Sequence, residues 1–454
     1  MMNLQEAARG IGARVSGPDV AVSGVGSDSR AVVPGELFVA LLGERFDGHD
    51  YVADVMARGA AAAMVSDAIA ATREQEWQAY PLLRVDDTRL ALGRLAAYWR
   101  GQFAGPVVAV TGSNGKTTVK EMIASILQKA AGSVEAVLAT RGNLNNEIGV
   151  PLTLLGLRSA HRYAVVEMGM NHPGEIAYLT ALAQPDVAVI NNAHAAHLAG
   201  LGTVEAVARA KGEIYQGLRE DGTAVINADD AHAGLWRELA GKRRVLSFGL
   251  EQAADVSASY RLHPLSSDLM ICGAAGEIRL TLPVPGLHNV RNALAAAATA
   301  QALGLGNEVI AAGLAAFTGV KGRLQYKTGL HGAHLIDDSY NANPDSMRAA
   351  IAVLAAMPGK RVLVIGDMGE LGAGEAELHG RIGESAQAAG IDRLLALGDL
   401  SVKAARAFGP GGQHFETIED LLAELENLLD ADTAVLVKGS RFMRMERVVK
   451  SFEV

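Results

Sequence analysis

The chain has 454 residues, of which 49% are hydrophobic and 20% charged, enough for about three domains of roughly 150 residues each. The formal net charge of −9 argues against a general nucleic-acid binder, because Lys and Arg dominate no segment of the sequence. The single cysteine, Cys272, excludes an internal disulfide framework and suits a reducing compartment.

The sequence also lacks the signals of membrane insertion and export. The most apolar stretch, Ala293–Leu305, is too short to span a bilayer and contains Thr and Gln. The amino terminus carries Glu6 and Arg9 where a signal peptide needs an apolar core. We therefore expect a soluble cytoplasmic protein without an integral membrane segment, and we expect a monomer.

The first block, residues 1–103, mixes short apolar strands with glycine turns, which predicts a small α/β domain. Residues 36–41 are typical of a strand, and residues 51–59 and 88–99 are typical of helices. The segment 101–106 combines Gly and Pro without periodicity, which indicates a linker and a candidate hinge.

The second block, residues 104–318, repeats a strand, a glycine-rich turn and a helix. This order predicts a parallel sheet covered by helices. The expected strands are Val107–Val110, Tyr163–Val166 and Val187–Ile190. An Ala-rich helix is expected at 290–303, and the segment 318–323 marks the next boundary and a second candidate hinge.

The third block, residues 319–454, repeats the α/β rhythm independently and predicts a Rossmann-like domain. Its expected strands are His334–Ile336, Arg361–Ile365, Arg393–Leu397 and Ala434–Val437.

A glycine-rich turn, Thr111–Thr118, follows the buried-type strand at 107–110. From Val119 onward apolar residues recur at helical spacing, so the turn opens a helix. Gly112 and Gly115 would let backbone N–H groups approach phosphate oxygens, and the helix N-terminus adds partial positive charge. The pattern therefore predicts a phosphate-binding loop.

In this loop Lys116 would bridge terminal phosphates, and the hydroxyl of Thr117 would bind Mg²⁺. The general eight-residue pattern has glycine where this chain has Val110, so the match is to a shorter variant. The alternative interpretation is a plain glycine turn that leads into a helix.

Acidic and basic side chains elsewhere in this block are candidates for a metal site. Glu167 ends the strand at 163–166, and carboxylate oxygens suit Mg²⁺. His194 and His197 follow the strand at 187–190, and spacing alone does not choose between them. Lys211 is by default a solvated helix residue and would bind a cation only as a carbamate formed with CO₂.

Together these motifs resemble the Mur ligase family over essentially the whole chain, with the loop Thr111–Thr118 similar to that family's short phosphate loop. The resemblance implies catalytic roles for Lys116, Glu167, His197, Lys211 and Arg323, and metal binding by Thr117, Glu167, His197 and a carbamylated Lys211. It implies that the nucleotide contacts are Gly112, Ser113, Asn114, Gly115, Lys116, Thr117, Thr118, Asn289, Asn292, Arg323 and Asp338.

The first block resembles the UDP-binding domain of the two last-acting peptide-adding members of the family. The third block, with Asp338–Asp345, Gly366–Gly372 and Lys438–Arg441, resembles the member that adds D-alanyl-D-alanine. The Asp-Asn-Pro-Arg motif of the diamino-acid-adding sister is absent. The implied substrate contacts are Ser29, Arg30, Asp47, His49, Asn143, Asn145, Asn146, Tyr340, Asn341 and Asn343.

The resemblance thus implies an enzyme that uses ATP and Mg²⁺ to join D-alanyl-D-alanine to a UDP-N-acetylmuramoyl-tripeptide through an acyl phosphate. The runner-up is the diamino-acid-adding sister ligase. From another class, the phosphate loop alone would also fit a nucleotide-gated binding module. A dinucleotide oxidoreductase is disfavoured, because the glycines in Val362–Gly372 lack the required spacing.

Overall fold

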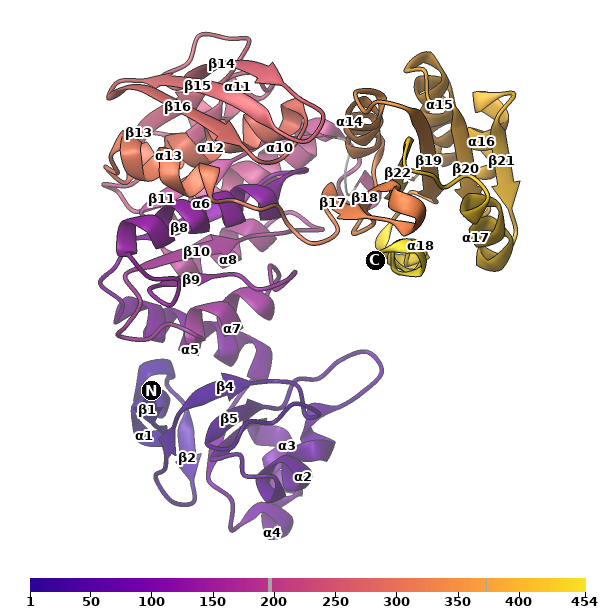
Figure 1. Ribbon diagram of the computed structural model, residues 1–454. Coiled ribbons are helices and arrows are strands. Elements are labelled where there is room, and N and C mark those ends of the chain that lie inside the picture. Colours follow the sequence, from indigo (N-terminus) through magenta and orange to yellow (C-terminus); the bar gives the residue numbers. More distant parts are fainter. Residues whose placement is uncertain (195–197, 373) are drawn as a thin grey trace.

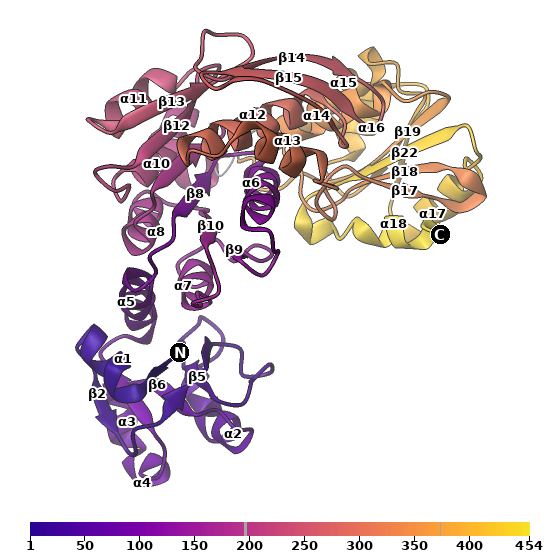
Figure 2. The ribbon, with the colours of Figure 1, turned by 60° about the vertical axis from the view of Figure 1, so that its left-hand side comes forward.

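The computed structural model describes residues 1–194, 198–372 and 374–454. The chain forms three α/β lobes (Figure 1). The amino-terminal and carboxyl-terminal lobes both adjoin the central lobe and do not adjoin each other in either view (Figures 1 and 2).

The first lobe is built on a five-stranded sheet in the order β2-β7-β6-β5-β4, parallel except for β2. Its strands are β2 (Arg14–Ser16), β4 (Gly24–Gly26), β5 (Glu36–Val39), β6 (Ala62–Ser66) and β7 (Leu82–Val85), with the small pair β1 (Met2–Asn3) and β3 (Ala21–Val22). Its helices are α1 (Leu4–Ile11), η1 (Gly48–Tyr51), α2 (Val52–Ala57), α3 (Asp67–Thr72) and α4 (Glu74–Trp77).

Helix α5 (Thr88–Gly101) joins the first lobe to the central one and packs against both. Trp99 Nε1 donates to the carbonyl of Leu157 at 3.0 Å. The buried guanidinium of Arg100 donates to the carbonyls of Ala183 at 2.8 Å and Gln184 at 3.1 Å. These bonds tie the carboxyl end of α5 to the central lobe.

The central lobe contains a six-stranded sheet in the order β13-β12-β11-β8-β10-β9, in which every pairing is parallel. The three strands predicted from the sequence are present, and β9, β12 and β13 extend the sheet at its edges. The strands are β8 (Val107–Thr111), β9 (Val137–Ala139), β10 (Tyr163–Glu167), β11 (Val187–Ile190), β12 (Thr223–Asn227) and β13 (Arg244–Phe248).

Both faces of this sheet are buried, which explains the continuous apolar runs of its strands. In β8, Val107 and Ala109 point to one hydrophobic cluster, and Val108 and Val110 point to the other. The first face is covered by α7 (Gly149–Leu155), α8 (Glu175–Ala183), α10 (Val204–Gly212) and α11 (Ala233–Ala240), with α9 (Leu198–Leu201) and η2 (Glu213–Tyr215) nearby in the chain.

The second face is covered by α6 (Lys116–Ala131), α12 (Leu287–Ala302) and α13 (Asn307–Ala315). An antiparallel sheet of three strands lies outside these helices (Figure 2). It comprises β14 (Ser257–Leu262), β15 (Ser267–Gly273) and β16 (Gly276–Leu282). The sequence indicates a strand region without a motif at 265–276, but it did not predict this three-stranded layer.

The third lobe has a six-stranded sheet in the order β17-β18-β22-β19-β20-β21, parallel except for the edge strand β17. The strands are β17 (Gln325–Thr328), β18 (His334–Asp338), β19 (Lys360–Gly366), β20 (Arg393–Leu397), β21 (Gly412–Phe415) and β22 (Thr433–Lys438). The helices are η3 (Leu330–Gly332), α14 (Pro344–Ala355), α15 (Glu375–Ala388), α16 (Val402–Phe408), α17 (Ile418–Glu426), η4 (Arg441–Met443) and α18 (Glu446–Phe452).

The predicted fold class, three α/β domains with a parallel central sheet, is therefore confirmed. Among the described residues, no helix has the length and apolar character needed to cross a bilayer. In the central sheet β8 lies between β10 and β11, so the loops that follow these three strands meet at one edge.

Candidate active site

A cleft of about 1160 Å³ opens between the central and third lobes. The central lobe contributes the loops after β8, β10, β11 and β12 and the start of α12. The third lobe contributes the loops after β18, β19 and β22. Both lobes therefore present the carboxyl ends of parallel strands, where open α/β sheets bind ligands.

The predicted phosphate loop lines this cleft between β8 and α6. Lys116 Nζ donates to the carbonyls of Gly112 at 2.8 Å and Ser113 at 3.3 Å. Burial lowers the pKa of Lys116, and the nearby charge of Glu167 opposes this shift. The loop thus holds a lysine at the helix N-terminus, where the backbone already favours anions.

Gly115 is a position where the loop geometry requires glycine. Its φ is +76°, and a Cβ atom there would lie 2.4 Å from Oδ1 of Asn292 and 2.7 Å from Nδ2 of Asn191. Both amides therefore pack directly against the loop backbone, and any side chain at 115 would displace them.

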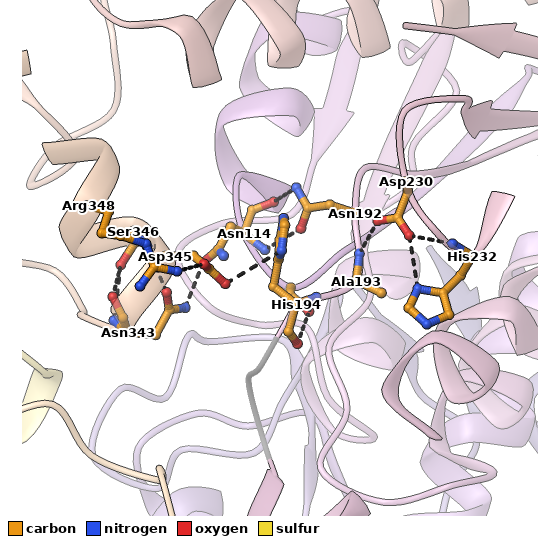
Figure 3. A network of polar contacts seen from close by, with 11 residues as sticks. Asn114, Asn192, Ala193, His194, Asp230, His232, Asn343, Asp345, Ser346 and Arg348 are labelled. Atoms are coloured by element: carbon orange, nitrogen blue, oxygen red, sulfur yellow. Dashed lines mark hydrogen bonds and ion pairs between the residues drawn. The ribbon is translucent and has the colours of Figure 1, made fainter. Parts of the chain in front are cut away.

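Two asparagines that the sequence analysis did not single out support the loop. Asn191 Nδ2 and Asn192 Nδ2 donate to the carbonyl of Asn114 at 2.9 and 3.1 Å, and the Asn114 N–H donates to Oδ1 of Asn192 at 2.8 Å. Figure 3 shows the Asn114–Asn192 contacts. Both asparagines directly follow β11, the neighbour of β8, which is the signal that could have identified them.

The third lobe contacts the phosphate loop at its apex. Asn343 Nδ2 donates to Oδ1 of Asn114 at 2.7 Å, and the His194 ring faces Asp345 at 3.5 Å (Figure 3). Arg323 Nη2 donates to Oγ1 of Thr117 at 3.1 Å. Side chains of two lobes thus converge on the loop that is predicted to hold phosphate.

Glu167 lies opposite the loop with only 2% of its surface exposed. Its Oε1 accepts a hydrogen bond from Asn145 Nδ2 at 2.8 Å. Its Oε2 is buried and has no hydrogen-bond partner among the residues that the structure describes. Since Glu167 also lines the cleft, this oxygen is a free acceptor next to the phosphate loop.

The described residues contain no group of three or more His, Cys, Asp or Glu side chains that could hold a metal on their own. Mg²⁺ needs no such group, because it keeps several waters and commonly binds through one or two protein oxygens plus phosphates. The free oxygen of Glu167 and the hydroxyl of Thr117 fit this donor set.

Of the two other predicted metal ligands, His197 and Lys211, the structure describes only Lys211. His197 lies outside the described residues. Lys211, near the carboxyl end of α10, is 1% exposed. Burial lowers the pKa of Lys211 well below its ordinary value, and the nearby positive charge of Lys116 adds to the effect.

The predicted adenine contacts, Asn289 and Asn292, open helix α12. Asn289 Nδ2 donates to the carbonyl of Pro285 at 2.8 Å, and Asn292 Oδ1 accepts from Asn191 Nδ2 at 2.9 Å. Both side chains are buried at the wall of the cleft, and Asn292 connects α12 to Asn191, the residue that follows β11.

The predicted ribose-binding acid, Asp338, ends β18 and lines the same cleft. Its Oδ2 accepts from Lys438 Nζ at 2.6 Å, and its Oδ1 accepts from the Leu324 N–H at 3.1 Å. Burial raises the pKa of Asp338, an effect that the charge of Lys438 opposes. The guanidinium of Arg323 stacks 4.3 Å above the centre of the Tyr340 ring.

Comparison with known families accounts for nearly all of the chain. Residues 21–100 match the Mur ligase family catalytic domain, residues 110–300 the Mur ligase middle domain, and residues 322–441 the Mur ligase glutamate ligase domain. This chain belongs to the Mur ligase family.

Individual Mur ligases match the chain end to end. It is 45% identical to the UDP-N-acetylmuramoyl-tripeptide--D-alanyl-D-alanine ligase of Escherichia coli (strain K12), over 97% of this chain and 95% of that one. MurF from Acinetobacter baumannii has a TM-score of 0.91 at 39% identity, covering 99% and 98% of the two chains. The MurF ligase of Thermotoga maritima, solved in complex with ADP, has a TM-score of 0.81 at 30% identity, covering 94% and 96%.

The substrate contacts implied by the Mur ligase resemblance fall into two groups. Six of them line the cleft, namely Asn143, Asn145 and Asn146 from the central lobe and Tyr340, Asn341 and Asn343 from the third. The other four lie in the first lobe and outside the cleft, namely Ser29, Arg30, Asp47 and His49.

Within the first lobe, His49 is 2% exposed and its two ring nitrogens already have protein partners. Nδ1 lies 2.6 Å from Oδ1 of Asp47, and Nε2 accepts from the Ser66 N–H at 2.9 Å. Arg30, in contrast, is exposed and pairs with Asp28 at 2.8 Å. Arg30 is therefore accessible to a ligand although it is paired with Asp28, whereas His49 is buried and joins η1 to β6.

Proposed function

We propose that this Mur ligase joins D-alanyl-D-alanine to UDP-N-acetylmuramoyl-tripeptide, with ATP converted to ADP and phosphate, in the synthesis of peptidoglycan precursors. The observation that carries the proposal is that the phosphate loop with Lys116 and the carboxylate of Glu167 line one cleft between the central and third lobes. The end-to-end likeness to ligases named for this reaction supports it.

The chemistry follows from the difficulty of forming an amide in water. A carboxylate oxygen of the tripeptide attacks the γ-phosphorus of ATP, the bond to the bridging oxygen breaks, and ADP leaves. The neutral amine of the dipeptide then attacks the acyl carbon of the resulting acyl phosphate. Phosphate leaves with the C–O bond electrons, and the amine gives up its proton to solvent.

Cationic side chains stabilise the charge that develops on the transferring phosphoryl group. Lys116 projects from the phosphate loop, and Arg323 approaches it from the third lobe through Thr117. A donor placed in this way contributes roughly 10²–10³ in rate. No strong base is required, because an α-amine has a pKa of roughly 8 and a useful fraction is neutral near pH 7.5.

Mg²⁺ bound at Thr117 and Glu167 would neutralise the phosphates of ATP. His197 and a carbamylated Lys211 are the proposed ligands of a second ion. The depressed pKa of Lys211 supports this role, since only a neutral amine reacts with CO₂. ¹³C NMR after exposure to labelled bicarbonate should show a carbamate carbon that is lost in Lys211→Arg; an identical spectrum in both proteins would exclude the modification.

The remaining assignments place each substrate on its own part of the chain. We propose that residues 1–103 bind the UDP end through Ser29 and the exposed Arg30, that residues 104–318 bind ATP, and that residues 319–454 complete the site. Asp47 and the buried His49 are bonded to each other and would shape the first-lobe surface without direct contact of the His49 ring with the ligand. We place the reaction in the cytoplasm, which supplies ATP and suits the lone Cys272.

A phosphate-release assay tests the proposal directly. UDP-tripeptide, ATP and Mg²⁺ should give rapid phosphate release that depends on D-alanyl-D-alanine, with an equimolar amide product detected by mass spectrometry. Faster turnover of UDP-dipeptide with a diamino acid would favour the sister ligase instead. Slow hydrolysis that neither substrate stimulates would indicate a nucleotide-gated binding module.

A further inference from the structure

The loop between β9 and α7 is fastened to the end of strand β10 by three hydrogen bonds. The N–H of Glu167 donates to Oγ1 of Thr140 at 2.9 Å. The N–H of Gly169 donates to the carbonyl of Asn145 at 2.8 Å. Asn145 Nδ2 donates to Oε1 of Glu167 at 2.8 Å. Of these three bonds, only the one from Asn145 Nδ2 to Glu167 Oε1 involves the Glu167 side chain, which lines the cleft.

This bond distinguishes the two oxygens of the Glu167 carboxylate. Oε1 accepts a hydrogen bond from the amide of Asn145, whereas Oε2 is buried and has no partner within 1–194, 198–372 and 374–454. A buried acceptor left unsatisfied costs free energy, and such a group in a folded protein requires an explanation. A ligand that enters the cleft beside the phosphate loop would satisfy it.

The side chain of Asn145 packs against the backbone of Gly169, two residues after Glu167. A Cβ atom on Gly169 would lie 2.9 Å from both Cγ and Oδ1 of Asn145 and 3.1 Å from its Nδ2. The amide therefore lies directly on Gly169, and glycine is needed there to leave it room. No positive φ is involved, so alanine at 169 would act only through this contact.

We propose that Asn145 is a positioning residue that turns the Glu167 carboxylate so that Oε2 faces the divalent cation. This inference rests on the proposed function of Glu167 as a Mg²⁺ ligand. Partners of this kind orient metal-binding carboxylates, and their loss typically weakens metal binding about 10- to 100-fold.

The same bond connects two parts of the site. Asn143 and Asn146, from the same loop as Asn145, line the cleft and are proposed contacts of the UDP-linked substrate. A substrate that orders this loop also orders Asn145, and through it Glu167. Because coupling between two binding sites is reciprocal, the UDP-linked substrate should tighten cation binding, and the cation should tighten substrate binding.

The test measures Mn²⁺ binding by electron paramagnetic resonance, with a non-hydrolysable ATP analogue present and with or without the UDP-tripeptide. Asn145→Ala should weaken Mn²⁺ binding about 10- to 100-fold and abolish the tightening by substrate. Gly169→Ala should reproduce both effects, because it displaces the same amide. Leu144→Ala is the matched control, because this exposed side chain belongs to the same loop but not to the residues that line the cleft, so Mn²⁺ affinity and its response to substrate should stay unchanged.

Kinetics provide a second readout that a general loss of structure would not produce. In Asn145→Ala the Mg²⁺ concentration for half-maximal rate should rise in the same proportion, with recovery of kcat at saturating Mg²⁺. Unchanged Mn²⁺ affinity in both folded variants, Asn145→Ala and Gly169→Ala, would overturn the inference.

The variant Glu167→Gln distinguishes two outcomes: that Asn145 does not position Glu167, and that Glu167 does not bind the cation at all. Loss of Mn²⁺ binding in Glu167→Gln with none in Asn145→Ala would reject only the positioning role. Normal Mn²⁺ binding in Glu167→Gln would reject Glu167 as a ligand, and the inference with it.

Discussion

Asp338 and Lys438 are register partners at the ends of the neighbouring strands β18 and β22, and their side chains form a buried ion pair. Removing one charge of such a pair leaves the other buried without compensation, at a cost of about 3–5 kcal/mol. We therefore expect Lys438→Met to lower the free energy of unfolding by this amount. Urea denaturation of the wild type and the variant measures it.

The matched control for this pair is the double variant Asp338→Asn with Lys438→Met, which removes both charges. Because no unpaired charge remains, its stability should lie well above that of Lys438→Met alone. A double variant no more stable than the single one would show that packing, and not charge, explains the loss.

His288, in the first turn of α12, makes stability depend on pH. Burial lowers the pKa of His288 from 6.5 to about 4, and the charges of Lys438 and Arg291 add to the shift. Between these values the unfolded chain holds the extra proton, so stability rises with pH from about 4 to 6.5. The full shift corresponds to about 3 kcal/mol, and solvent contact with part of the ring reduces it.

Denaturant titrations at several pH values test this prediction. The wild type should gain stability between pH 4 and 6.5, and His288→Gln should gain measurably less over the same interval. Equal slopes in the two proteins would assign the pH dependence to other groups.

At the scale of elements, the phosphate loop and helix α6 form the unit on which the nucleotide site depends. The loop backbone is already held by Asn191 and Asn192, and Asn343 bonds the side chain of Asn114, so removal of one side chain should leave the fold intact. Lys116→Ala should therefore abolish ligation with little change in thermal unfolding. Phosphate release measures the loss of ligation, and calorimetry measures thermal unfolding. Near-normal turnover in Lys116→Ala would contradict the assignment of Lys116 to phosphate binding.

The elements also show where the sequence pattern was informative. Apolar residues 107–110 followed by glycines and a helical repeat predicted β8, the loop and α6 from neighbouring residues alone. The antiparallel layer β14–β16 was missed, because its strands are half exposed and no motif distinguishes them from other surface strands. The short edge strand β9 was missed because three residues carry too little periodicity.

At the scale of the whole molecule, the reaction requires groups from three lobes to meet. In the structure the third lobe already contacts the phosphate loop, whereas the proposed UDP contacts Ser29 and Arg30 lie outside the cleft. We therefore predict that substrate binding brings the first lobe closer to the cleft. Lobe closure of this kind positions the reactants and excludes water.

The contacts of α5 bear on where the first lobe can pivot. The sequence predicts hinges at 101–106 and 318–322, but Arg100 ties the end of α5 to the central lobe. Thr88 Oγ1, at the start of α5, donates to the carbonyl of Ala40 in the first lobe at 2.8 Å, so α5 is bound to both lobes and the hinge at 101–106 stays a prediction. The segment 318–322 stays the predicted pivot of the third lobe.

Small-angle X-ray scattering tests closure. An ATP analogue and the UDP-tripeptide together should reduce the radius of gyration toward the value of about 22 Å expected for a compact chain of this length. Lys116→Ala, which should not hold the nucleotide, serves as the control without compaction. An unchanged scattering curve of the wild type under saturating ligands would contradict the closure mechanism.

The sequence by itself determined the three α/β blocks, the phosphate loop and the carboxylate at the end of β10, because each is encoded by residues adjacent in the chain. Only the tertiary structure decided that Asn191 and Asn192 support the loop, that Asn145 holds Glu167, and that Arg323 reaches Thr117 from another lobe. The two residues of each pair are 22 to 206 positions apart in the sequence. Hydrogen bonds between distant segments leave no periodic pattern in the sequence. They can be recognised only in the folded structure, where the ends of the strands and the lobes lie close together.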